Sequence, residues 1–63
     1  MISDQIINDI ERYKSLNGKN PTLVVGTITF SSLYNGEIPL DKIFKIFGCV
    51  ATVANFQFGY YLL

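Results

Sequence analysis

The chain has 63 residues, an apolar fraction of 49% and a formal net charge of zero from five basic and five acidic side chains. This length allows one domain, residues 1–63. The balanced charge argues against a protein that binds nucleic acid or anionic lipid through long-range electrostatic attraction. There is no histidine and a single cysteine, Cys49, which excludes an intrachain disulfide and gives no zinc-binding pattern. Because so small a domain gains little stability from its own core, we expect a partner, often a second copy of the chain.

The first predicted element is an amphipathic helix over residues 3–18. Its apolar side chains recur at three- and four-residue spacing, as a helix with one buried face requires. These side chains are Ile6, Ile7, Ile10 and Tyr13. Gly18 suits the left-handed residue that ends a helix, and Pro21 prevents the helix from continuing.

Residues 22–25 predict a buried strand because they are β-branched or apolar. The segment that follows, residues 27–34, has two interpretations. The β-branched residues 27–29 favour a strand that continues through Phe30. Alternatively, the strand breaks at Gly26 and a short helix buries Ile28, Phe30 and Leu33.

A turn at Asn35 and Gly36 fits both interpretations. Beyond it, residues 38–48 predict a short helical turn or loop that ends at Gly48. Its inward-pointing side chains are expected to be Ile43, Phe44 and Phe47.

The last segment, residues 46–63, contains no charged side chain. As a membrane helix it would place the amides of Asn55 and Gln57 close to the centre of the bilayer, which is costly. As a hairpin it would consist of a β-branched strand, a turn that exposes the amides of Asn55 and Gln57 to water, and an aromatic strand. We favour the hairpin. The predicted fold class is therefore α+β, with the N-terminal amphipathic helix packed on a small, about three-stranded sheet that includes a C-terminal hairpin.

The segments "ERYKSLNGKNPTLVVG", "TITFSSL" and "IFGCVATV" together resemble a recurring design in small phage and prophage proteins, and similar strand and Phe/Leu-Gly elements occur near the end of phage capsid-type proteins. The matching residues are Tyr13, Lys14, Gly18, Lys19, Pro21, Thr22, Phe30, Leu33, Phe47 and Gly48. The resemblance implies a helix over residues 27–34, a Phe-Gly pair that opens the terminal hairpin, and a viral or mobile-element origin. It implies no active site, and the segment "YNGEIPLDK" departs from the design because it is longer and less polar.

Residues suited to catalysis are missing from the sequence. Without histidine the usual general base near neutral pH is absent, and Cys49 has no basic neighbour in the sequence to activate it. We therefore expect no enzyme, and no catalytic, cofactor-binding or metal-binding residues. Arg12, Lys14 and Lys19 could form a nucleic-acid-binding edge, but favourable interaction with the helix dipole explains them better.

The aromatic and leucine residues near the carboxyl end predict an interface. Successive side chains of a strand point to opposite faces, so one of Tyr60 and Tyr61 and one of Leu62 and Leu63 must face away from the helix. The predicted interface residues are Phe58, Tyr60, Tyr61, Leu62 and Leu63.

These residues predict a non-enzymatic protein–protein interaction or assembly protein that forms a homo-oligomer or binds a protein partner. We expect it in the cytoplasm because the amino terminus is polar rather than signal-like and the lone thiol lies in an apolar run. A phage-encoded virion or accessory protein would act in the host cytoplasm or the virion. The alternatives are a small nucleic-acid-binding regulator and a tail-anchored membrane protein, and we expect contact with neither nucleic acid nor membrane.

Overall fold

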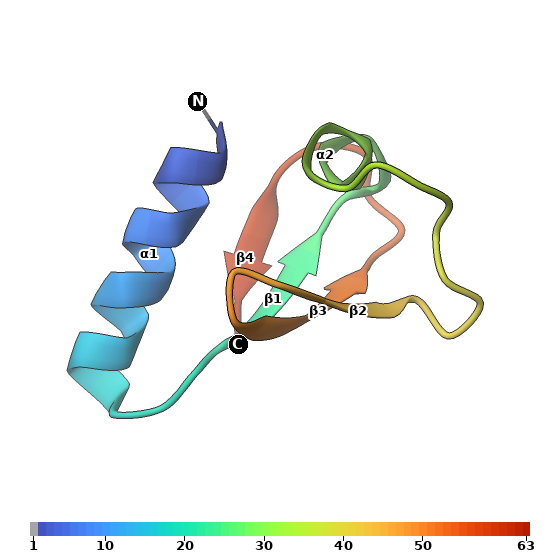
Figure 1. The fold of residues 1–63 in the computed structure, drawn as a ribbon. Helices are drawn as coiled ribbons and strands as arrows, with labels where there is room; N and C mark the ends of the chain where they lie inside the picture. The colour runs from blue at the N-terminus through green and yellow to red at the C-terminus, as the bar shows by residue number, and fades with distance from the viewer. Residues whose placement is uncertain (1) are drawn as a thin grey trace.

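A computed structural model describes residues 2–63 and contains two helices and a four-stranded sheet (Figure 1). The elements in chain order are α1 (Ile2–Asn17), β1 (Thr22–Val25), α2 (Thr27–Leu33), β2 (Ile43–Ile46), β3 (Cys49–Val53) and β4 (Tyr60–Leu62). The strands lie in the order β2-β3-β1-β4. The predicted α+β fold class is thus confirmed, with one strand more than expected.

Strand β1 occupies the interior of the sheet. It pairs with β3 in parallel on one side and with β4 in antiparallel fashion on the other. Its residues Leu23, Val24 and Val25 are all buried, as is typical of a strand covered on both faces. The predicted C-terminal hairpin is therefore wrong, because β1 lies between the two strands that would have formed it.

The hairpin of this fold is made by β2 and β3 instead. These strands pair in antiparallel fashion from Ile43 opposite Thr52 to Ile46 opposite Cys49, and residues 47 and 48 connect them. Phe47 and Gly48 have φ angles of 53° and 75°, the left-handed values that a two-residue hairpin turn requires. The predicted helical turn or loop over residues 38–48 is confirmed for residues 38–42, which lie outside any helix or strand, and is wrong for residues 43–48, which form β2 and this turn.

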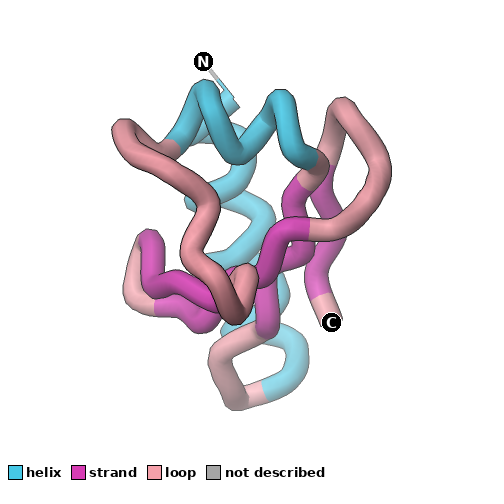
Figure 2. Tube along the Cα trace, turned by 90° about the vertical axis from the view of Figure 1, so that its right-hand side faces the viewer, coloured by secondary structure: helices cyan, strands magenta, loops and turns pink. Residues whose placement is uncertain are grey.

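Both helices contribute to one core on the same face of the sheet. The inward positions of β1, Leu23 and Val25, lie beside Ala51 and Val53 of β3, and these side chains belong to one buried cluster with residues of both helices. The helical members are Ile6, Ile10 and Phe30. In Figure 2 α2 runs across the top of the molecule while α1 runs down behind it.

Ile7 and Ile43 were predicted to point inward and are exposed. Ile7 lies off the buried face of α1, which Ile6 and Ile10 define. Ile43 was expected to be buried beside Phe44, but adjacent residues of a strand alternate in direction, so only Phe44 reaches the core.

Helix α2 begins where the loop between β3 and β4 supplies acceptors for its first N–H groups. The N–H of Thr27 donates to the carbonyl of Phe56 at 2.9 Å, and the N–H of Ile28 donates to the carbonyl of Gln57 at 2.8 Å. These acceptors replace the side-chain cap that Gly26 lacks, so the helical interpretation of residues 27–34 is confirmed. Ile28, which that interpretation placed in the core, is exposed, and Thr29 is buried in its place.

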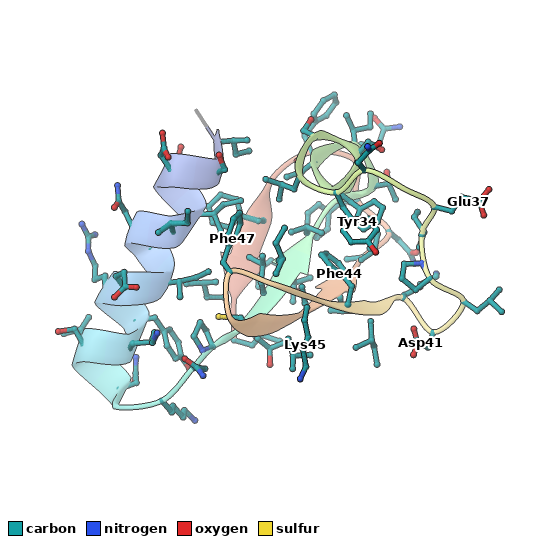
Figure 3. All side chains as sticks on the ribbon, viewed as in Figure 1. Tyr34, Glu37, Asp41, Phe44, Lys45 and Phe47 are labelled. Carbon is teal, nitrogen blue, oxygen red and sulfur yellow. The ribbon has the colours of Figure 1, made fainter. Side chains whose placement is uncertain are left out.

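An aromatic cluster joins the end of α2 to the sheet. The ring centroids of Phe30 and Phe44 are 5.0 Å apart in an edge-to-face arrangement, and Tyr34 lies 5.2 Å from Phe30 and 5.5 Å from Phe44. Figure 3 shows Tyr34 and Phe44 against each other, while Phe47 reaches toward α1. The cluster therefore ties α2 to β2, the strand farthest from β4.

Candidate interaction surface

One face of the sheet is not covered by either helix. On β1 it carries Val24, which is buried and yet does not belong to the core cluster. Val24 lies opposite Thr52 of β3 and Tyr61 of β4, so it is covered by neighbours on its own face. The register places Ile43 and Val50 on this same face.

Large apolar side chains dominate this face. The exposed fractions are 52% for Ile43, 45% for Val50, 49% for Tyr61 and 65% for Leu63, and we call these four residues with Val24 the open face. Lys45 is the one charged side chain at the outward register positions of the described strands. It points away from the helices in Figure 3. An apolar patch that spans a whole sheet is typical of an interaction surface.

The loop between β3 and β4 extends the aromatic part of the open face. The ring of Phe56 stacks on Tyr61 with centroids 6.0 Å apart and planes inclined by 28°. The backbone of this loop is fixed, because Phe56 accepts a hydrogen bond from α2 and the N–H of Gly59 donates to the Thr29 hydroxyl at 2.8 Å. Phe56 is thus held on Tyr61 by the contacts that cap α2.

The predicted interface residues divide between two faces of the molecule. The alternation expected for the last strand is confirmed, since Tyr61 and Leu63 point to the open face while Tyr60 and Leu62 pack against the core. Phe58 lies on the loop and is 70% exposed. The interface role of all five residues stays a prediction. Three residues of this surface were not predicted from the sequence: Ile43, Val50 and Phe56. The alternating pattern of residues 49–53 could have indicated Val50.

A second feature is a groove between α1 and β4. Its volume is about 680 Å³, and its walls include Ile2, Leu16 and Leu62. The hydroxyl of Tyr60 donates a hydrogen bond to Asp9 and links the middle of α1 to the strand. Burial raises the pKa of Tyr60, and the hydrogen bond and negative charge of Asp9 raise it further, whereas a hydrogen bond with Gln5 opposes the shift.

The three basic residues proposed for nucleic acid do not form one surface. Arg12 lines the groove beside β4. Lys14 and Lys19 line a separate hollow at the end of α1, together with Gly18 and Asn20. This separation weakens the nucleic-acid alternative, because a phosphate backbone is bound by charges that follow it along one surface.

The described residues give little support to other chemistry. The Cys49 thiol is 3% exposed and lies 3.7 Å from the carbonyl oxygen of Phe47. Within residues 2–63 there is no group of three or more histidine, cysteine or acidic side chains placed to hold a metal ion. Neither described helix combines the length and the apolar character that a membrane crossing needs.

Comparisons with known proteins add no relative to this description: no protein-family model, curated protein or solved structure matches the chain significantly. The resemblance to small phage proteins therefore stays a prediction. The function of the open face has to be inferred from the geometry of the chain itself.

Proposed function

We propose that the chain is a non-enzymatic protein–protein interaction or assembly protein that binds a protein partner through the open face. One observation carries the proposal: both helices lie on the same side of the sheet, so four large apolar side chains of the other side remain about half exposed. Water-exposed apolar surface of this extent is costly for a small domain, and a partner protein would remove that cost.

The chemistry of the open face indicates the kind of partner. Ile43, Val50 and Leu63 offer aliphatic surface, and Tyr61 adds an aromatic ring with a polar tip, a combination common at the centre of interfaces. Completing the burial of each side chain contributes about 1 kcal/mol, because half of its surface is already covered. Lys45 lies on β2, an outer strand of the sheet, and favours a partner with an acidic group at its rim.

The proposal includes the cytoplasm as the place of action. It also includes a phage-encoded accessory or virion protein acting in the host cytoplasm or the virion. Only the resemblance of the segments around Gly18, Pro21 and Gly48 supports this viral assignment.

A photo-crosslinking experiment tests the proposal. A benzophenone amino acid replaces Val50 on the open face, and a matched control carries it at Leu40, a fully exposed loop residue. In the cells that naturally make the chain, we expect a discrete protein adduct from position 50 and none from position 40. The same adducts from both positions, or adducts from neither, would contradict the proposed role of the open face.

A further inference from the structure

The outer edge of β4 carries backbone groups that β1 does not use. Thr22 and Leu63 exchange two backbone hydrogen bonds of 3.0 and 2.9 Å, and the N–H of Gly26 donates to the carbonyl of Gly59 at 2.9 Å. Since such bonds alternate along an antiparallel pair, the backbone N–H and C=O groups of residues 59, 61 and 63 point toward β1. The N–H and C=O groups of Tyr60 and Leu62 therefore point outward, where the described chain places no further strand.

The groove beside this edge has a wall with an approximate two-fold pattern. Along α1 the groove residues include Ile2 at one end, Leu16 at the other, and the opposite charges of Asp9 and Arg12 between them. A copy of α1 that runs in the reverse direction and offers Leu16 to Ile2 would place its Arg12 three residues, about 4.5 Å along the axis, from Asp9, a distance that the long arginine side chain spans. The wall is thus complementary to itself in apolar character, and the Arg12 of each copy can reach the Asp9 of the other.

We infer that a second copy of the chain occupies this groove, with the two β4 strands paired antiparallel about a two-fold axis and the two α1 helices side by side. This inference goes beyond the proposed function, because it assigns the β4 edge and the groove beside α1 to a second copy and leaves the open face to a protein partner. Tyr60 of each copy lies opposite Leu62 of the other and exchanges two backbone hydrogen bonds with it. The four-stranded sheet of one copy then continues across the axis into that of the other.

One axis serves the strands and the helices together. The strand pairing has its centre at Tyr61, and the Ile2–Leu16 pairing of the helices has its centre at Asp9. The hydrogen bond from Tyr60 to Asp9 places these two centres next to each other within one copy. A two-fold axis through one centre therefore passes close to the other.

The pairing also joins the two open faces into one surface. Tyr61 of each copy meets its counterpart across the axis, next to the Phe56 ring already stacked on it. The dimer thereby presents a row of aromatic rings, Phe56 and Tyr61 from each copy, at the middle of a doubled open face.

A second copy fits this groove better than an unrelated extended peptide does. Strand β4 has only three residues, so its edge alone provides few hydrogen bonds. The contacts that can add affinity and orientation come from α1, and they are the ones that a reversed α1 matches. A peptide strand beside β4 would leave Ile2 and Leu16 of α1 without apolar partners.

Amide hydrogen exchange combined with light scattering tests the inference. We expect a mass of twice 7.1 kDa at high concentration, with the amides of Tyr60 and Leu62 protected in the dimer and fast to exchange in the diluted monomer. The Tyr61 amide, which faces β1, serves as the internal control and should stay protected in both states. A monomer at every concentration, or a dimer in which Tyr60 and Leu62 exchange quickly, would overturn the inference.

A pair of charged variants tests the helix register. Leu16→Lys and Ile2→Glu should each raise the dissociation constant of the homodimer by about tenfold or more. Mixed in equal amounts, the two variants should form a heterodimer tighter than either homodimer, because the introduced ammonium group of one chain then meets the introduced carboxylate of the other. Unchanged homodimers, or a mixture that gains nothing, would argue against the antiparallel helix pair.

The outcomes separate this inference from the proposed function. If Val50→Lys abolishes the dimer while the edge amides of β4 exchange freely, the copies meet through the open face and only the edge pairing is wrong. If the chain stays monomeric but position 50 captures a protein partner, the proposed function holds without the dimer. If the edge dimer forms but position 50 captures nothing, the proposed function fails and the pairing stands.

Discussion

Replacing Gly26 with alanine tests whether the loop between β3 and β4 caps α2. Gly26 has an ordinary φ of −72°, so an alanine at this position can adopt the same backbone conformation without strain. A Cβ atom at this position would lie 2.6 Å from the carbonyl oxygen of Gln57 and 2.9 Å from the Phe56 ring. Because the nearest obstacle is backbone, the loop itself has to move.

That movement breaks the hydrogen bonds that hold the loop to the start of α2. The bonds at risk join Thr27 to Phe56, Ile28 to Gln57 and Gly26 to Gly59. Each contributes about 0.5–1.5 kcal/mol net, so losing two or three costs about 1–4.5 kcal/mol. A chain of this length has a total free energy of unfolding of about 3–9 kcal/mol. Gly26→Ala should therefore lower the melting temperature by about 5–35 °C.

Thermal and urea denaturation followed by circular dichroism would measure the effect. The matched control is Gly36→Ala, where the added Cβ meets only the side-chain ring of Tyr34, at 3.2 Å, in an exposed loop. We expect the control to cost much less than Gly26→Ala, because only the Tyr34 ring has to shift, by a few tenths of an ångström, and the restricted unfolded chain offsets part of that cost. If Gly26→Ala costs less than about 0.5 kcal/mol, a change no larger than that of an ordinary surface substitution, the loop is not the cap that the geometry indicates.

Three further predictions concern the core. Tyr60→Phe removes the hydrogen bond to Asp9 and should cost about 0.5–1.5 kcal/mol near neutral pH. The pKa of Tyr60 is raised in the folded state, so the stability that its neutral hydroxyl contributes is complete below the unfolded pKa of about 10 and is lost as pH rises through the folded pKa. In urea titrations the parent should therefore lose more stability than Tyr60→Phe between neutral and strongly alkaline pH. Parallel dependence of the two proteins on pH would contradict this. Phe30→Ala leaves a cavity against Phe44 and should cost about 3–5 kcal/mol, enough to unfold much of the protein at 25 °C, and a cooperative transition at the parental temperature would refute it. Cys49 should react with a thiol reagent only as fast as the domain opens, and labelling at the rate of a free thiol in the native state would show that it is not buried.

The elements that depend on local pattern were predictable from the sequence. The spacing of Ile6 and Ile10 indicated α1, and the alternation of strand residues indicated the outward direction of Tyr61 and Leu63. Alternation holds whichever strand lies alongside, so the direction of Tyr61 was correct although its partner strand was not. The apolar character of Cys49 and its neighbours likewise predicted its burial.

The pairing of strands was not predictable in the same way. Residues 54–59 have the length of a hairpin loop, and nothing local shows that β1 inserts between the strands they connect. The clue was in β1 itself, where Leu23, Val24 and Val25 offer apolar surface to both faces and so indicate an interior strand. The true hairpin was concealed because its turn uses Phe47 at a positive φ, which non-glycine residues seldom adopt.

The groove between α1 and β4 was also outside the reach of the sequence. Ile2, Leu16 and Asp9 are separated from β4 by most of the chain, and only the packing of α1 against the core brings them to that edge. The sequence could show that Arg12 and Lys14 are close in number. The predicted helix also implied that they face different sides, because residues two apart lie about 200° apart around a helix axis, but it could not show that β4 lies beside Arg12.

The interior position of β1 has a consequence for how the chain is made. Residues 22–25 leave the ribosome early, but Val50 and Tyr60, which pair with Thr22 and Val25, are translated much later. The acceptors that cap α2, at Phe56 and Gln57, belong to the same late segment. The nascent chain therefore has no stable half to form during synthesis, and folding waits as a single event for β4 to emerge. Until then β1 lacks one of its two neighbouring strands, and its apolar residues are the part of the incomplete chain most open to aggregation.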